Sequence, residues 1–167
     1  MLNYAKAEDF PNDKYWSGRY FAYLKDVISE IRELENVGIG SVLEIGCNGI
    51  QLVKGSDTID ICGNPTYKID AGKELWPIQS KKYDLAICCQ VWEHLNGGQQ
   101  FAFKELQRVS KKAIITIPFM WKSGDEIHKG ITKEAINNWY CNEKPLKEKL
   151  IGSRLLSVFD FGDKKCT

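Results

Sequence analysis

The sequence predicts an α/β fold with a mostly parallel β-sheet. Short apolar runs are bounded by turn-forming residues, and residues 41–45 are the first of them, an apolar segment that contains Glu44 and leads into a turn with Gly46 and Gly49. Such a run is typical of a strand buried in a parallel sheet. Because ligands bind beyond the carboxyl ends of parallel strands, we expect a site at this turn.

The composition is that of a globular domain without bulk charge. Of the 167 residues, 43% are hydrophobic and 27% are charged, and the formal net charge is +1. This length fits a single domain, residues 1–167, and a near-neutral chain has no general attraction to nucleic acid or anionic membranes. No apolar run is long enough to span a bilayer, and residues 1–9 lack the apolar region of a signal peptide. These features predict a cytoplasmic protein.

The six cysteines show no metal-binding spacing. None belongs to a C-x-x-C pair, and Cys88 and Cys89 lie inside an apolar run. We therefore expect free, buried thiols and predict no metal site.

Residues 1–40 are expected to form an arm followed by one long helix. Between residues 17 and 35, apolar residues recur at three- and four-residue steps, which is the pattern of an amphipathic helix. These positions are Tyr20, Leu24, Val27, Ile28, Ile31 and Leu34.

Residues 41–117 are expected to form the core sheet, with few crossover helices. Strands are predicted at 41–45, 58–61, 67–70, 83–89 and 113–117, and one helix at 98–110. The five residues 62–66 can span roughly 17 Å, more than the roughly 13 Å of a four-residue strand, so a bare loop suffices for that parallel return. The sheet is therefore trimmed, and we expect the N-terminal helix, or a second subunit in a homodimer, to cover part of it.

Residues 118–167 are expected to provide a loop, a helix and a last strand on the ligand side. Thr132 can cap a helix that runs to about Tyr140, and residues 153–161 are apolar enough for a strand. A turn at Gly162-Asp163 would leave only four residues after it. The sequence therefore predicts an incomplete C-terminal hairpin.

Oxygen-bearing side chains lie at or near the ends of four predicted strands. Glu44, Asp60, Asp70 and Gln90 would rim one crevice, because parallel strands end at the same edge. Carboxylates and amides suit a ligand with hydroxyls, an amine and a base edge, and they suit phosphate poorly.

Phosphate-binding motifs are missing from the same turn. The dinucleotide fingerprint G-x-G-x-x-G would need glycine at Asn48 and Gln51, and no G-x-x-x-x-G-K-[ST] is present. A nicotinamide or flavin dinucleotide therefore remains a minor alternative.

An ordered set of motifs connects these segments. It consists of Val42 to Gly49, Asp60, Asp70-Ala71, Tyr83-Asp84-Leu85, Gln90 to Leu95, Ile114 to Pro118, His128, and Thr132 to Ile136. Over about residues 41–140 the set resembles class I S-adenosylmethionine-dependent methyltransferases, in particular the small type 11 group. The resemblance implies a Rossmann-like fold of class I methyltransferase type and methyl transfer from S-adenosylmethionine, with S-adenosylhomocysteine as product, to a small or medium acceptor.

The resemblance also implies which residues hold the methionine part of the cofactor. Glu44 and Gly46 match the acidic-x-Gly motif, Asn48 belongs to the same turn, and Gln90 matches the position beneath the sulfonium. By position alone, Arg19 and Tyr20 on the N-terminal helix could close over the cofactor carboxylate. The turn departs from the family's G-x-G-x-G at Asn48 and at Ile50.

The adenosine part is implied to lie against the next two strands. Asp60 matches the acid that binds the ribose hydroxyls. Asp70 and Ala71 match the pair that reads the adenine edge, through a carboxylate and a backbone N–H.

Catalysis of this type needs no obligatory base, because alignment of the reactants supplies much of it. For a hydroxyl acceptor a base would help, and the two histidines, His94 and His128, are the candidates near neutrality, with His128 preferred. A small-molecule acceptor is expected, and neither nucleic acid nor a membrane is. The alternative is a catalytically inactive methyltransferase-like scaffold that binds the cofactor or a partner protein.

Overall fold

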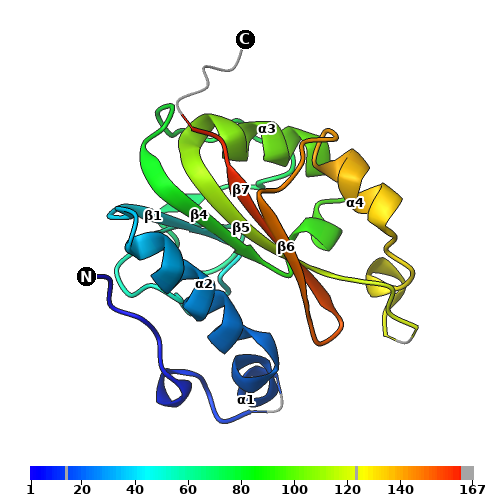
Figure 1. The fold of residues 1–167 in the computed structure, drawn as a ribbon, viewed down its shortest axis with the longest axis horizontal. Coiled ribbons are helices and arrows are strands. Elements are labelled where there is room, and N and C mark those ends of the chain that lie inside the picture. The colour runs from blue at the N-terminus through cyan, green and yellow to red at the C-terminus, as the bar shows by residue number, and fades with distance from the viewer. Residues whose placement is uncertain (14, 123, 163–167) are drawn as a thin grey trace.

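The sheet at the centre of the computed structural model has seven strands in the order β3-β2-β1-β4-β5-β7-β6. Figure 1 labels five of them, from β1 to β6 in this order. The structure describes residues 1–13, 15–122 and 124–162. The strands are β1 (Val42–Ile45), β2 (Asp57–Asp60), β3 (Tyr67–Lys68), β4 (Tyr83–Cys89), β5 (Ser110–Pro118), β6 (Lys147–Ile151) and β7 (Arg154–Asp160). Strands β1 to β5 pair in parallel, and β7 pairs antiparallel with both neighbours. The predicted mostly parallel α/β class is confirmed.

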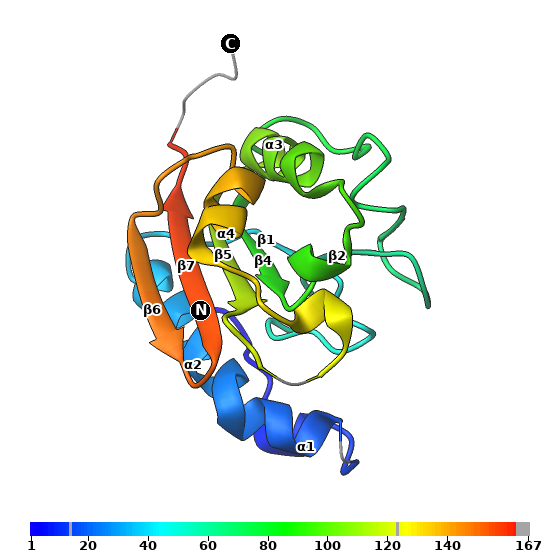
Figure 2. The same ribbon diagram turned by 90° about the vertical axis from the view of Figure 1, so that its right-hand side faces the viewer.

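Helices cover both faces of this sheet. They are α1 (Trp16–Arg19), a π-helical turn (Tyr20–Leu24), α2 (Lys25–Glu35), α3 (Gln99–Val109) and α4 (Lys133–Trp139), with short 3₁₀ turns at Ala7–Asp9, Trp92–His94 and Glu126–His128. Helix α2 lies on one face, and α3 and α4 lie on the other (Figures 1 and 2). The Thr132 hydroxyl caps α4 by accepting a hydrogen bond from the Ala135 N–H at 3.2 Å, as its position suggests.

Successive side chains of a strand point to opposite faces of the sheet, so the core forms two apolar layers, one on each face. On β5, Ile114 packs in the layer with α2, whereas Ile115 packs in the layer with α3 and α4. Ala5 and Phe10 of the N-terminal arm join the α2 layer. The N-terminal helix therefore covers part of one face of the sheet, as expected, but its apolar layer includes residues of β1, β4, β5 and β7 and none of β2 or β3.

The short connection between β2 and β3 also matches its prediction. The strands pair in parallel, with Ile59 opposite Tyr67. Thr58 and Thr66 exchange hydrogen bonds at 3.0 and 3.1 Å, each hydroxyl accepting from the other residue's N–H. These two bonds hold the return without a helix.

The C-terminal hairpin is complete, so the predicted incomplete hairpin is wrong. Strand β6 precedes β7, and the turn lies at Gly152, whose φ is +58°. Strand β6 was not recognised in the sequence because its first three residues, Lys147, Glu148 and Lys149, are charged and do not show the apolar alternation of a half-buried strand.

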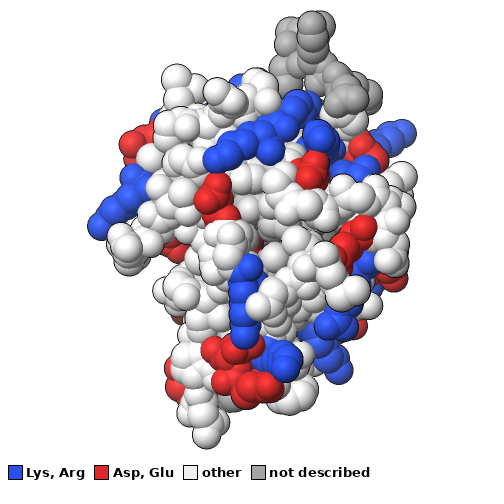
Figure 3. All heavy atoms as spheres, turned by 90° about the vertical axis from the view of Figure 1, so that its left-hand side faces the viewer, with Lys and Arg blue, Asp and Glu red and all other residues white. Residues whose placement is uncertain are grey.

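The surface carries mixed charges. On the face shown in Figure 3, Lys and Arg side chains are interspersed with Asp and Glu, in keeping with a net charge of +1. Within the described ranges, no helix combines the length and the apolar character that crossing a membrane requires.

Candidate functional site

A cavity of about 420 Å³ lies at the carboxyl ends of the parallel strands. Its volume falls within the range of small-molecule sites. Six of the seven cofactor-binding residues predicted from the sequence line it, namely Gly46, Asn48, Asp60, Asp70, Ala71 and Gln90. The expected common edge is thus present for these six residues.

In the turn after β1, the backbone of Gly46 lies close against the side chain of Val91. Gly46 has a φ of +66°, and a Cβ atom on it would lie 2.4 Å from Cγ2 of Val91. Asn48 also has a positive φ, +49°, and its N–H donates to Oδ2 of Asp60 at 3.0 Å. Because the Gly46 N–H donates to the Ile59 carbonyl at 2.8 Å, the end of β2 fixes this turn at two points.

Asp60 and Asp70 are held by local hydrogen bonds. Oδ1 of Asp60 accepts from the Cys62 N–H at 3.1 Å. Asp70 accepts from the Gly72 N–H at 3.0 Å and from Nζ of Lys73 at 2.9 Å, and the Lys73 bond is the main reason why the pKa of Asp70 lies below its usual value. Both carboxylates are therefore oriented without being fully covered.

Glu44, the seventh predicted residue, has a different environment. Its Oε2 accepts from the Leu52 N–H at 2.8 Å, and its Oε1 accepts from the Val53 N–H at 2.8 Å and from the Ser56 hydroxyl at 2.9 Å. Burial raises the pKa of Glu44, although these three donors act against the rise. The carboxylate therefore anchors the loop between β1 and β2.

A second, smaller cavity of about 60 Å³ adjoins the first. Glu44 and Arg19 line it, and it shares Gly46, Asn48 and Gln90 with the larger cavity. The Arg19 guanidinium lies 3.8 Å from the centre of the Tyr15 ring. A cation on the N-terminal helix thus faces one end of a continuous cleft.

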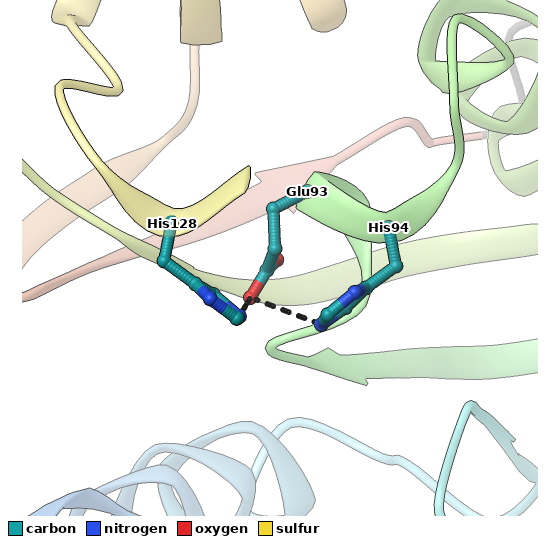
Figure 4. A group of neighbouring side chains, drawn as sticks. All are labelled: Glu93, His94 and His128. Atoms are coloured by element: carbon teal, nitrogen blue, oxygen red, sulfur yellow. Dashed lines mark ion pairs between the residues drawn. The ribbon is translucent and has the colours of Figure 1, made fainter. Parts of the chain in front are cut away.

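The two predicted histidines come together on two short turns (Figure 4). The rings of His94 and His128 are 5.0 Å apart, and Nε2 of each lies 3.9 Å from Oε1 of Glu93. His94 lines the larger cavity. Burial, followed by the neighbouring His128, lowers the pKa of His94, which favours a neutral imidazole at pH 7.

Glu93 is the residue at this site that sequence reasoning missed. Its side chain is fully buried, and neither carboxylate oxygen has a hydrogen-bond partner among the described residues. Burial raises the pKa of Glu93 to about 7, against the opposing effect of its own N–H and of Arg19 and Arg154. The available signal was its position directly before His94, just after a buried strand.

Comparison with known proteins identifies the fold. No protein-family model and no curated protein matches the chain. A candidate type 11 methyltransferase from Sulfolobus solfataricus superposes with a TM-score of 0.61 at 12% identity, over 83% of this chain and 94% of that one. A SAM-dependent methyltransferase from Aquifex aeolicus gives 0.56 at 12% identity, over 78% and 87%. The 16S rRNA methylase ArmA gives 0.55 at 16% identity, over 92% and 90%. The chain therefore has the fold of the class I S-adenosylmethionine-dependent methyltransferases.

Proposed function

We propose that the protein transfers a methyl group from S-adenosylmethionine to a small or medium acceptor. One observation carries the proposal: the cleft at the strand ends presents carboxylates along its larger part and a guanidinium at its smaller end. S-Adenosylmethionine has the complementary order, with ribose hydroxyls and an adenine amine at one end and a carboxylate at the other.

In this proposal the larger cavity takes the adenosine. Asp60 accepts hydrogen bonds from the ribose hydroxyls, and Asp70 accepts one from the adenine amine. The backbone N–H of Ala71 reads a ring nitrogen of adenine. Lys73 also lines this cavity, and its bond to Asp70 keeps that carboxylate ionised and oriented.

The smaller cavity takes the methionine end. Arg19 pairs with the cofactor carboxylate, and the turn from Gly46 to Asn48 lets the chain of the ligand pass close to the backbone. Gln90, whose N–H donates to the Thr116 carbonyl at 2.9 Å, lies beneath the sulfonium. Glu44 acts on this end by holding the loop between β1 and β2 rather than by a free carboxylate.

The chemical step is an in-line displacement. A lone pair of the acceptor forms the new bond to the methyl carbon, and the carbon–sulfur bond breaks with its electron pair going to sulfur. Positioning alone can contribute up to about 7–11 kcal/mol to such a step. His94 lines the larger cavity, and Glu93 and His128 lie next to His94. These three side chains are the groups that would take up a proton from a hydroxyl acceptor.

Calorimetric titration of the full chain with S-adenosylmethionine, S-adenosylhomocysteine and NAD tests the cofactor. We expect heat and a rise in Tm with the first two and none with NAD. Transfer of labelled methyl groups to acceptor pools then tests activity. Binding without transfer to any pool would favour the scaffold alternative, and no heat or thermal shift at millimolar ligand would refute cofactor binding.

The acceptor pools should include RNA as well as small molecules. The near-neutral charge argues against nucleic acid. The similarity to an rRNA methylase nevertheless makes a structured RNA a necessary arm of the assay.

A further inference from the structure

The carboxylate of Glu93 is an incomplete polar site. Its side chain has 0% exposure, and neither oxygen accepts a hydrogen bond from any described residue. Buried polar groups in folded proteins are nearly always paired, and a carboxylate without a partner is costly to bury. Within the described part of the chain, Glu93 therefore lacks the partner that a buried carboxylate ordinarily has.

Two imidazoles lie close to this carboxylate. Nε2 of His94 and Nε2 of His128 each lie 3.9 Å from Oε1 of Glu93, beyond hydrogen-bond length. One ligand atom from each of the three residues lies within 4.8 Å of the other two. In a tetrahedral transition-metal site such atoms stand about 3.3 Å apart, so only small side-chain rotations separate this arrangement from coordination.

The two histidines differ in how firmly they are held. The His128 ring stacks on Trp121, with centroids 5.8 Å apart, and its side chain is 20% exposed. The His94 side chain is 47% exposed, so it has room to turn toward Glu93. A fixed imidazole, a buried carboxylate and an adjustable imidazole thus converge on one point (Figure 4).

We propose that Glu93, His94 and His128 bind a divalent transition-metal ion, with Zn²⁺ and Mn²⁺ as the probes that test it. Two imidazoles and one carboxylate form a ligand set that proteins use for such ions, and three protein ligands leave coordination positions open. The guanidinium groups of Arg19 and Arg154 act on the same carboxylate and oppose a cation, which limits the affinity.

The proposed site adjoins the larger cavity, because His94 lines that cavity. On the proposed function, an acceptor hydroxyl could occupy the open position. The three side chains are then ligands and no longer take up its proton, which passes to solvent. The oxygen attacks the methyl carbon, while the carbon–sulfur electron pair goes to sulfur. The metal site then implies an oxygen acceptor rather than an amine.

The chain offers a direct readout, since it contains only two histidines. Tag-free protein labelled with ¹⁵N is titrated with Zn²⁺ in the absence of cofactor, and the imidazole NMR signals are followed. We expect both signals to shift together and to saturate at one equivalent. Because Cys62 is exposed and thiols bind Zn²⁺, Mn²⁺ serves as the second probe, since it prefers oxygen and nitrogen ligands, and it should broaden both signals.

The isosteric variant Glu93→Gln should lower the affinity for either ion at least about tenfold. Glu126→Gln changes a glutamate that is 88% exposed and lies in the same 3₁₀ turn as His128; it is the matched control and should bind as the unmodified protein does. His94→Gln is a second ligand variant, and its partial exposure makes misfolding a poor explanation for lost binding.

Two results would overturn the inference: imidazole signals that do not respond to either ion at millimolar concentration, or equal binding by Glu93→Gln. Titration with S-adenosylhomocysteine on the same samples keeps the inference separate from the proposed function. Cofactor binding without metal binding rejects the metal site alone, and metal binding without cofactor binding rejects the methyltransferase proposal alone.

Discussion

Oδ2 of Asp60 accepts a hydrogen bond of 3.0 Å from the backbone N–H of Asn48. The end of β2 therefore supports the turn after β1, and the two segments form one unit rather than two separate ligand contacts. Changes at Asp60 should consequently affect both the shape of the turn and any ribose bound beside it.

Asp60→Ala should weaken S-adenosylhomocysteine binding by roughly 1–3 kcal/mol, because the ribose hydroxyls and the Asn48 N–H both lose their acceptor. Asp60→Asn is the matched variant, since it keeps one acceptor oxygen. It should lose less. Isothermal titration measures both, and an unchanged Kd for the alanine variant would remove Asp60 from the cofactor site.

Gly46→Ala should destabilise the protein and reduce cofactor binding. The new Cβ would meet Cγ2 of Val91 at 2.4 Å, and a φ of +66° is unfavourable for alanine. The double variant Gly46→Ala/Val91→Ala removes the clash but not the backbone strain, so it should recover part of the lost stability. Urea unfolding checks this, and no recovery at all would mean that backbone strain alone is responsible.

Glu44→Gln should cost about 1–3 kcal/mol of unfolding free energy. The amide has a single acceptor oxygen, and its NH₂ group would face the Leu52 or Val53 N–H. Ser56→Ala removes only one of the three donors and should cost about 0.5–1.5 kcal/mol. Denaturant titration that finds equal costs would argue against an anchoring role for the carboxylate.

Asp84 should make stability dependent on acid pH. Burial tends to raise the pKa of Asp84, but hydrogen bonds from Lys111, Ser41 and Gly40 outweigh it and hold that pKa well below 3.8. A carboxyl group whose pKa is lower in the folded state stabilises that state at any pH above its pKa in the unfolded chain. This stabilisation is lost as the pH falls toward the pKa of the group in the folded state.

Asp84→Asn should therefore be less stable than the unmodified protein by about 1–3 kcal/mol at neutral pH. The difference should persist down to about pH 4 and shrink below it. Thermal unfolding of both proteins across this range is the measurement. A difference that varies between pH 5 and 8 would point to another group.

The sequence allowed β1, β4 and the middle of β5 to be predicted because these strands are buried along most of their length, whereas β3 is partly exposed and only two residues of the predicted 67–70 form it. Residues 83–89 match β4 at both ends, and the predicted helix at 98–110 matches α3 within one residue. Strand β6 (Lys147–Ile151) was not predicted. It is an edge strand whose exposed positions carry charged residues, so it lacks the apolar pattern by which strands are recognised. The π-helical turn at Tyr20–Leu24 was not predicted either, because the spacing of its apolar residues also fits an ordinary α-helix.

At the candidate site, the residues that were predictable are those tied to strand ends. Asp60 and Asp70 follow directly from the positions of β2 and β3. The burial of Glu93 was not predictable, because it depends on turns after β4 and β5 that meet only in three dimensions. The engagement of Glu44 by the Leu52 and Val53 N–H groups depends in the same way on the path of a loop.

The outer strands of the sheet bear on how copies of this chain can meet. Strand β3 has only two residues, and the lysines of β6 reach across to Glu30 on α2. Short or charged border strands are poor templates for backbone pairing with another molecule. Concentrated protein should therefore resist fibril formation through these borders, and a homodimer would have to use helix or loop surfaces instead of extending the sheet.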